Sequence, residues 1–254
     1  MRILFVSEEV APFTCISETA DLVRMLPEQL QETGDFEVRI MMPRYGLISE
    51  RRNRLHEVIR LSGSEVEVDG RTETLKVKVA SIPGIRLQVY FMDNSHYFKR
   101  KGVQADKEGE IFADNAQRAL FFSRSVLHTI HNLGWTPDIV HCFGWMSSLT
   151  PLLLRTEFSQ DPTFEKAKSV YTPGLISSDE HVSAGFNSQL PTLDALNVEE
   201  NTISELGKNV SDMVLYAPSD SSANPTHPQL PEDMEAMCGQ LINVYEQVMA
   251  EVPV

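Results

Sequence analysis

Residues 1–7 (MRILFVS), the turn 8–18 (EEVAPFTCISE) and an apolar pattern at helical spacing from Thr19 decide the fold class. A short apolar run that is bounded by turn residues and followed by such a pattern is typical of a buried strand leading into a helix. The stretch therefore predicts the first strand–turn–helix unit of an open α/β sheet. In such sheets ligands bind outside the carboxyl ends of the strands, so we expect the turn 8–18 to line a cleft.

The rest of the chain repeats this alternation of strand and helix. Further buried strands are predicted at 36–42, 86–92, 138–142, 168–172 and 212–216, helices at 114–132 and 147–155, and an irregular loop at 173–201. Between 57 and 80 apolar and polar residues alternate around Asp69-Gly70, which indicates an antiparallel hairpin. We predict an α/β fold with a Rossmann-like, doubly wound, mainly parallel sheet and a hairpin insertion at about 57–80.

Length and composition predict one large domain with a short appendage. The 254 residues are 42% apolar, enough for a full core. Residues 1–217 form the predicted Rossmann-like domain, and residues 218–231, rich in proline and serine, form a predicted linker. Residues 232–251 are predicted to form a C-terminal helix that packs back on the domain.

Charge and cysteine content exclude several classes of protein. Lys and Arg total 22 against 36 Asp and Glu, a net charge of −14 that argues against nucleic acid as a partner. The three cysteines form no CxxC pair and favour a reducing, cytoplasmic setting. The sequence has no apolar window of about 18 residues and no signal-peptide pattern, so we expect no membrane association.

Five ordered motifs carry a family resemblance. They are ILFVSEEVAPF at 3–13 with Ala20-Asp21 and Leu26-Pro27, MPRYGLI at 42–48, VYFMDN at 89–94 with HYF at 96–98, DNAQR at 114–118 with FFSR at 121–124, and LGW at 133–135 with PDIVHC at 137–142. With these motifs the chain resembles the N-terminal half of the bacterial glycogen/starch synthases, glycosyltransferase family 5. The match runs from residue 1 to about 172 and weakens toward 217.

The resemblance implies a GT-B fold and a retaining transfer of glucose from ADP-glucose to an α-1,4-glucan. It also implies three polar clusters in which this chain departs from the family. The Lys-Thr-Gly-Gly turn is replaced by Cys15-Ile16-Ser17-Glu18, which puts a negative charge where a diphosphate would bind. The motif His-x-His-Asp-Trp-His-Thr loses its Asp at Gly144 and its last His at Met146, and Thr-Ile-His-Asn-Leu loses its His at Gly174. We therefore assign no catalytic residue.

A second set of residues matches family positions near the cleft and supplies candidates for residual sugar binding: Glu9, Asp21, Asn94, His96, Tyr97 and Trp145. The sequence favours a structural role for them, because Asp21 suits the helix dipole and an aromatic ring such as Trp145 suits a core. Asp179-Glu180-His181 are adjacent on a loop and so favour no metal site. No cofactor is expected.

These observations favour a glycogen/starch synthase-like protein that has lost independent glucosyltransferase activity and acts as a binding or interaction module. One alternative is half of an ADP-glucose-dependent synthase that is completed in trans by a separate C-terminal domain. Another is a lectin-like module that binds glucan through Tyr97 and Trp145. The expected partners are another protein, or a second copy of the chain bound through the old interdomain face, with glucan as a further candidate.

Overall fold

The computed structural model describes residues 1–174, 186, 190 and 202–250. Its main sheet has eight strands in the order β10-β9-β8-β1-β2-β7-β6-β3. The strands are β1 (Arg2–Ser7), β2 (Glu37–Pro43), β3 (His56–Glu57), β6 (Lys76–Ser81), β7 (Gln88–Asp93), β8 (Ile139–Phe143), β9 (Lys168–Thr172) and β10 (Met213–Val214). All pairs from β10 to β7 are parallel, and β6 and β3 add antiparallel pairs. The prediction of a doubly wound, mainly parallel sheet is confirmed.

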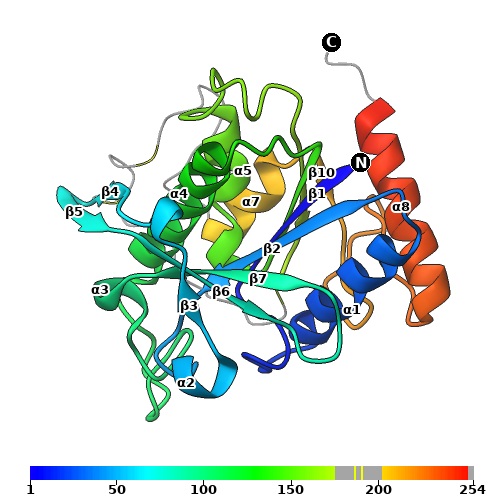
Figure 1. Ribbon diagram of the computed structural model, residues 1–254. Coiled ribbons are helices and arrows are strands. Elements are labelled where there is room, and N and C mark those ends of the chain that lie inside the picture. Colours follow the sequence, from blue (N-terminus) through cyan, green and yellow to red (C-terminus); the bar gives the residue numbers. More distant parts are fainter. Residues whose placement is uncertain (175–185, 187–189, 191–201, 251–254) are drawn as a thin grey trace.

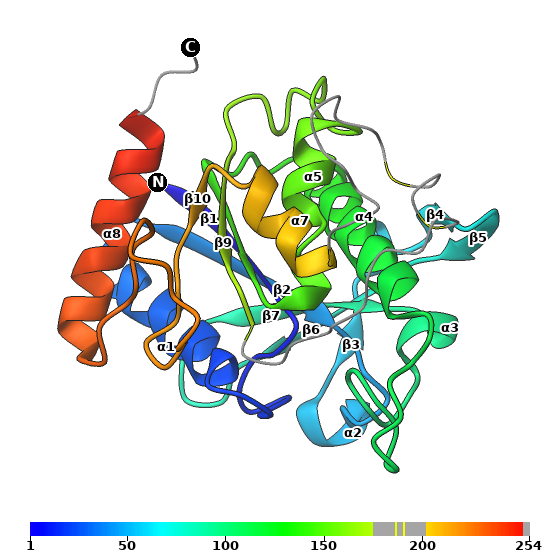
Figure 2. The same cartoon turned by 180° about the vertical axis from the view of Figure 1, so that it is seen from behind.

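Helices cover both faces of this sheet (Figures 1 and 2). One face carries α1 (Thr19–Glu32) and α8 (Met234–Ala250), and the other carries α4 (Asn115–Leu133), α5 (Thr150–Arg155) and α7 (Ile203–Val210). The helix predicted at 114–132 is thus α4, and it ends at Gly134, whose φ of 65° closes the helix. The helix predicted at 147–155 is shorter, because a 3₁₀ turn at Trp145–Ser147 precedes α5.

The core is centred on β1, which pairs with β2 on one side and β8 on the other. Ile3, Leu4, Phe5 and Val6 are all 0% exposed, as expected for a strand covered on both faces. On one side α8 contributes its buried face, consisting of Met237, Leu241, Val244, Tyr245 and Val248. The C-terminal helix is therefore part of the same hydrophobic core as the central strands.

The antiparallel region between 57 and 80 differs in detail from the single hairpin predicted there. A hairpin does form, from β4 (Glu65–Val68) and β5 (Arg71–Thr74), and it turns at Asp69-Gly70 with φ values of 57° and 65°. The alternating pattern after the hairpin is interrupted at Leu75, after which β6 joins the main sheet beside β7. At the start of the region only the short strand β3 forms, followed by the 3₁₀ turn Ile59–Leu61. Leu75 is 0% exposed, so this break lets a core residue bridge the two sheets.

The segment between β10 and α8 is fastened to the domain by hydrogen bonds. Tyr216 forms a β-bridge with Gln229, and the Gln229 side chain donates to the carbonyls of Ala217, Pro218 and Asp220 at 3.0–3.1 Å. Most of the irregular loop predicted at 173–201 lies outside the described residues.

Candidate functional site

The carboxyl ends of β1, β8 and β9 meet at one level of the sheet. Ser7 is the register partner of Phe143, and Phe143 is the partner of Thr172. The residues that follow these three, Glu8, Gly144 and the Pro173-Gly174 pair, therefore begin the loops of a common site. This is the position at which open α/β sheets bind ligands, and it contains all three of the sequence clusters that depart from the family.

The turn after β1 folds around the carboxylate of Glu9, which is 0% exposed. Glu9 Oε2 accepts from the backbone N–H groups of Ile16 and Ser17 at 2.5 and 3.3 Å, and Oε1 accepts from the Ser17 hydroxyl at 2.8 Å. Backbone N–H groups of a turn after a strand can donate to an anion. In this turn two of them donate to a carboxylate of the protein itself.

The other residues of this turn add no positive charge. Cys15 is largely exposed, and the partial desolvation of its thiol, together with the nearby negative charges of Asp21 and Glu9, raises the pKa of the thiol and keeps it protonated. Glu18 precedes α1, and its carboxylate accepts from the backbone N–H of Ser219 at 3.2 Å. Asp21 lies exposed in the first turn of α1, where a carboxylate interacts favourably with the helix dipole.

The loop after β8 is buried. Trp145 and Met146 are both 0% exposed, so the indole ring presents no open face. Ser147 donates to the carbonyls of Phe143 and Gly144 at 2.9 and 3.1 Å and ties the loop to the end of its strand. Gly144 itself has a φ of 77°, a conformation that non-glycine residues rarely adopt. The side chains of this loop therefore pack against the sheet and do not line an open surface.

A buried polar chain that the sequence did not suggest joins this site to α8. The His141 ring contacts the Tyr245 hydroxyl through Nδ1 at 2.7 Å and the Thr172 hydroxyl through Nε2 at 2.8 Å. Burial lowers the pKa of His141 well below its ordinary range and raises that of Tyr245, so both are neutral. The only hint in the sequence was a histidine inside an apolar strand, because its partner is 104 residues away.

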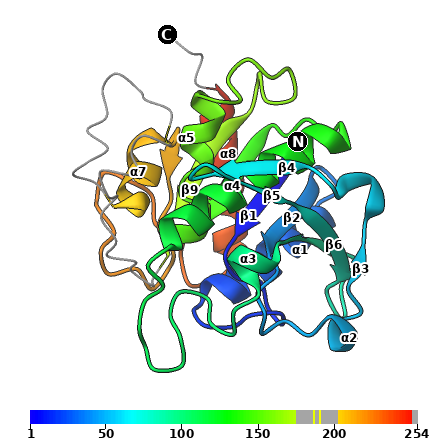
Figure 3. The ribbon, with the colours of Figure 1, turned by 90° about the vertical axis from the view of Figure 1, so that its left-hand side faces the viewer.

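The candidates after β7 are used to build a turn. The Asn94 side chain accepts from the N–H groups of His96 and Tyr97 and caps the short helix α3 (Ser95–Phe98). The Asn94 amide also donates to Glu73 and to the carbonyl of Thr74 at 3.2 and 3.1 Å. Tyr97 is 3% exposed and stacks on Phe121, whereas His96 is exposed and meets the edge of the Tyr97 ring. Figure 3 shows the loop after α3 at the same end of the molecule as helix α2 (Glu50–Asn53).

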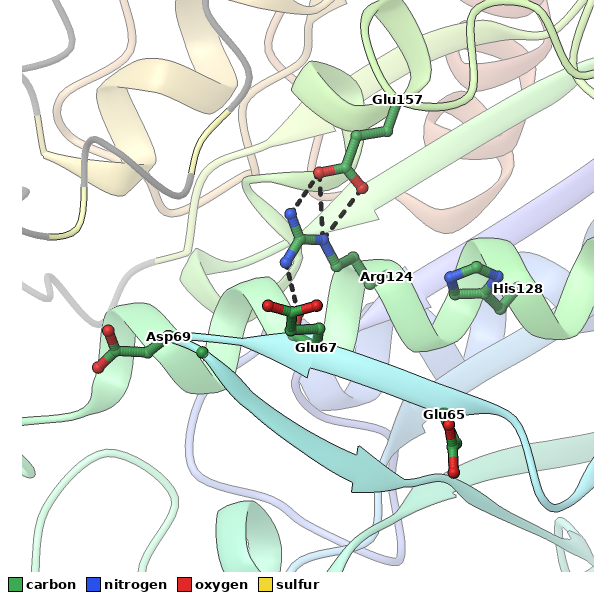
Figure 4. Close-up of a pocket in the computed structure, with 7 residues that line it drawn as sticks. Glu65, Glu67, Asp69, Arg124, His128 and Glu157 are labelled. Carbon is green, nitrogen blue, oxygen red and sulfur yellow. Dashed lines mark hydrogen bonds and ion pairs between the residues drawn. The ribbon is translucent and has the colours of Figure 1, made fainter.

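A separate hollow of about 540 Å³ lies between the β4–β5 hairpin and α4 (Figure 4). Its lining is mainly acidic, with Glu65, Glu67, Asp69 and Glu157 around Arg124 and His128. Arg124 pairs with the Glu157 carboxylate and donates to the Glu67 carbonyl at 2.5 Å, so its charge holds the hairpin to the helix. Arg124 and Glu157 therefore serve as structural contacts at the edge of this hollow.

The described residues form neither a metal cluster nor a membrane-spanning helix. Within the described ranges, no three His, Cys, Asp or Glu side chains are placed to hold a metal ion, and Asp179, Glu180 and His181 lie outside these ranges. No helix among the described residues has the length and apolar character to cross a membrane.

Comparison with known proteins places this geometry in a family. The family model described as starch synthase catalytic domain matches residues 2–173. The glycogen synthase of Chlorobium limicola is 45% identical over 172 residues, which cover 67% of this chain and 35% of that protein. The glycogen synthase of Chlorobaculum tepidum is 38% identical over 213 residues, covering 82% and 43%. The chain thus spans between a third and a half of the length of these two relatives.

Solved structures agree on the fold. The catalytic domain of starch synthase IV from Arabidopsis thaliana, bound to ADP and acarbose, superposes with a TM-score of 0.66 at 18% identity. The superposition covers 96% of this chain and 50% of that one. The sheet order, the retained strand motifs and the family match together show that this chain belongs to the starch synthase catalytic domain family.

Proposed function

We propose that this domain transfers no glucose on its own and acts as a binding or interaction module built on a glycogen synthase-like fold. The observation that carries the proposal is the turn after β1, where Cys15 stands at the position of the family lysine and Glu18 at that of a family glycine, around N–H groups that already donate to Glu9. A nucleotide diphosphate at this turn would find no positive charge at position 15 and would face the Glu18 carboxylate. The turn disfavours the sugar nucleotide that the family resemblance implies.

The loops after β8 and β9 support the same proposal. Positions 144 and 174 are glycines, so neither loop offers a side chain there to contact a sugar or to stabilise a developing charge. Gly144 and Trp145 follow a strand whose one retained polar residue, His141, is already bonded on both ring nitrogens. A domain that keeps the core residues of its family but loses the polar residues of the active site is expected when catalysis is no longer required.

Two alternatives make different demands on these residues. A synthase completed in trans by a separate C-terminal domain would still need this half to supply its own polar groups, which speaks against it. A lectin-like module would need Tyr97 and Trp145 as open platforms, but the two side chains are 3% and 0% exposed. An interaction module needs neither the catalytic polar groups nor open aromatic platforms for sugar.

The test is incorporation of radiolabelled glucose from ADP-glucose or UDP-glucose into glycogen by the purified chain. We expect counts equal to a no-enzyme control, with a full-length glycogen synthase as positive control. The variant that combines Cys15→Lys and Gly174→His with Glu8→Ala should also stay inactive, because one domain cannot enclose and desolvate the reacting groups. Incorporation by the unmodified chain contradicts the proposal, and incorporation only after adding a C-terminal synthase domain supports the trans alternative.

A binding measurement separates the remaining candidates. ADP and ADP-glucose at millimolar concentration should leave the melting temperature unchanged, since only a ligand well above its Kd stabilises measurably. Maltoheptaose should also leave it unchanged, and a shift that Asp21→Ala abolishes would favour a sugar site in the old cleft. A partner should then be sought by pull-down from the native cytoplasm.

A further inference from the structure

Glu8 is a buried carboxyl group that the proposed function does not use. Its side chain is 0% exposed, Oε2 accepts from the Met146 N–H at 3.3 Å, and Oε1 has no hydrogen-bond partner among the described residues. Burial raises its pKa well above the ordinary range, and the charge of Glu9 raises it further, so Glu8 is held neutral. Burying a carboxyl group with an unpaired oxygen lowers the folding stability, so a residue of this kind is expected to serve a purpose at its position.

Two glycines make room for this carboxyl group. A Cβ atom placed on Gly144 would lie 2.2 Å from both Cδ and Oε1 of Glu8. A Cβ atom placed on Gly174 would lie 2.9 Å from Oε1 and 3.0 Å from the Cα of Gly144. Such distances fall well inside van der Waals contact, so any larger residue at either position competes with Glu8 for the same space.

The three residues come from three neighbouring strands at one level of the sheet. Glu8 follows β1, Gly144 follows β8, and Gly174 comes two residues after the end of β9. Their volumes are complementary, with one long side chain placed against two residues that have none. Glu8 fills, from the central strand, the space that side chains of the two adjacent loops would fill.

We propose that Glu8 is an internal plug that closes this end of the cleft and excludes a ligand from the space between the loops after β8 and β9. This rests on the proposed function, because it names the residue that keeps the cleft empty. Gly144 and Gly174 form one packing unit with Glu8. A polar side chain restored at either glycine is accommodated only when Glu8 is shortened at the same time.

A double-mutant cycle tests the plug. We compare the wild type, Glu8→Ala, Gly144→Ala and the double variant by thermal and urea unfolding. Gly144 has φ 77° and ψ 175°, so an alanine there strains the backbone whatever its neighbours are, and only the difference between the two backgrounds at position 8 reports on the carboxyl group. Gly144→Ala should lower the melting temperature by roughly 5 °C more in the wild type than in Glu8→Ala. With Ala at position 8 the remaining loss is that of the backbone strain alone.

Each outcome decides the matter. Additive effects of Glu8→Ala and Gly144→Ala would overturn the plug, whereas a folded double variant beside an unfolded Gly144→Ala supports it. If neither folds, the same cycle is run with Gly174→Ala, where coupling supports the plug and additivity overturns it. Maltoheptaose binding that Glu8→Ala abolishes would also overturn it, because the carboxyl would then be a ligand contact. Glucose incorporation by the wild type would defeat the proposed function and leave the unfolding cycle to be judged separately.

Discussion

Two groups of ionisable side chains in and beside this sheet are removed from water, and they offset the desolvation of their charges in opposite ways. The first, here called the centre, consists of Glu8, which follows β1, and His141, the middle residue of β8, both 0% exposed. The second, called the rim, consists of Arg44, Glu50, Lys78 and Asp93 around β2, β6 and β7. Its side chains are 12–43% exposed.

The centre is neutral and the rim is charged. Burial raises the pKa of Glu8 and lowers that of His141, so each loses its charge. At the rim, burial alone would lower the pKa of Lys78, but the hydrogen bonds that its ammonium group donates to Asp93 and Glu50 outweigh burial and raise that pKa. The hydrogen bond from Lys78 in turn lowers the pKa of Glu50. Neutral packing fixes shape and resists substitution, whereas paired charges near solvent contribute little and respond to salt.

The largest effect is expected at His141. In His141→Phe the ring is kept, but the hydroxyls of Tyr245 and Thr172 both lose a buried partner, which should cost about 3 kcal/mol of unfolding free energy. The exposed His56 provides the control, since His56→Phe should stay within about 0.5 kcal/mol of the wild type. Urea unfolding measures both. Equal losses would mean that the chain from α8 to β9 contributes nothing to stability, and the contrast with the rim would disappear.

A pH-dependent effect is expected at Glu8. The folded state holds its proton, whereas the unfolded carboxyl ionises near its ordinary value of 4.5, so above that pH the unfolded state binds fewer protons. This contribution to stability is therefore complete below pH 4.5 and is lost as the pH rises through the raised folded value. Glu8→Gln removes it, because the amide does not ionise.

Melting curves of Glu8→Gln and wild type between acidic and slightly alkaline pH give the measurement. The variant should gain on the wild type by up to about 1.4 kcal/mol per pH unit until the folded pKa is reached. The groups that face Glu8 are Glu9, Tyr45 and Tyr171, which both proteins share, so the difference isolates position 8. A constant offset at every pH would show that Glu8 is ionised in the folded protein.

The sequence predicted the scaffold far better than the site. Apolar runs such as β1 and the wide buried face of α4 are local patterns, and the retained motifs identified their family. The outward signs of the cleft were also local, namely the replaced residues at Cys15, Gly144, Met146 and Gly174. The contacts of Gly144 and Gly174 with Glu8 could not be predicted, because these glycines are 136 and 166 residues away in the chain and only the sheet order β9-β8-β1 brings them beside Glu8. The break at Leu75 was missed for the same reason, since its burial comes from tertiary packing.

The smallest effect is expected at the rim, where Glu50→Gln should sharpen the comparison. Glu50 accepts from Lys78 at 2.7 Å, yet its side chain is 43% exposed, and Lys78 keeps Asp93 at 2.8 Å. Solvent screening therefore limits the loss to about 0.5 kcal/mol. Because the pKa of Glu50 is lowered, this contribution is present above pH 4.5 and is lost as the pH falls, the reverse of Glu8.

High salt, which shortens the Debye length to about 3 Å at 1 M, should reduce the stability loss of Glu50→Gln further. The differences for Glu8→Gln and His141→Phe should stay unchanged, because these groups are neutral. Unfolding at low and high salt, with the exposed Glu57→Gln as control, checks this, and a salt-independent loss above 2 kcal/mol would place Glu50 with the buried groups of the centre.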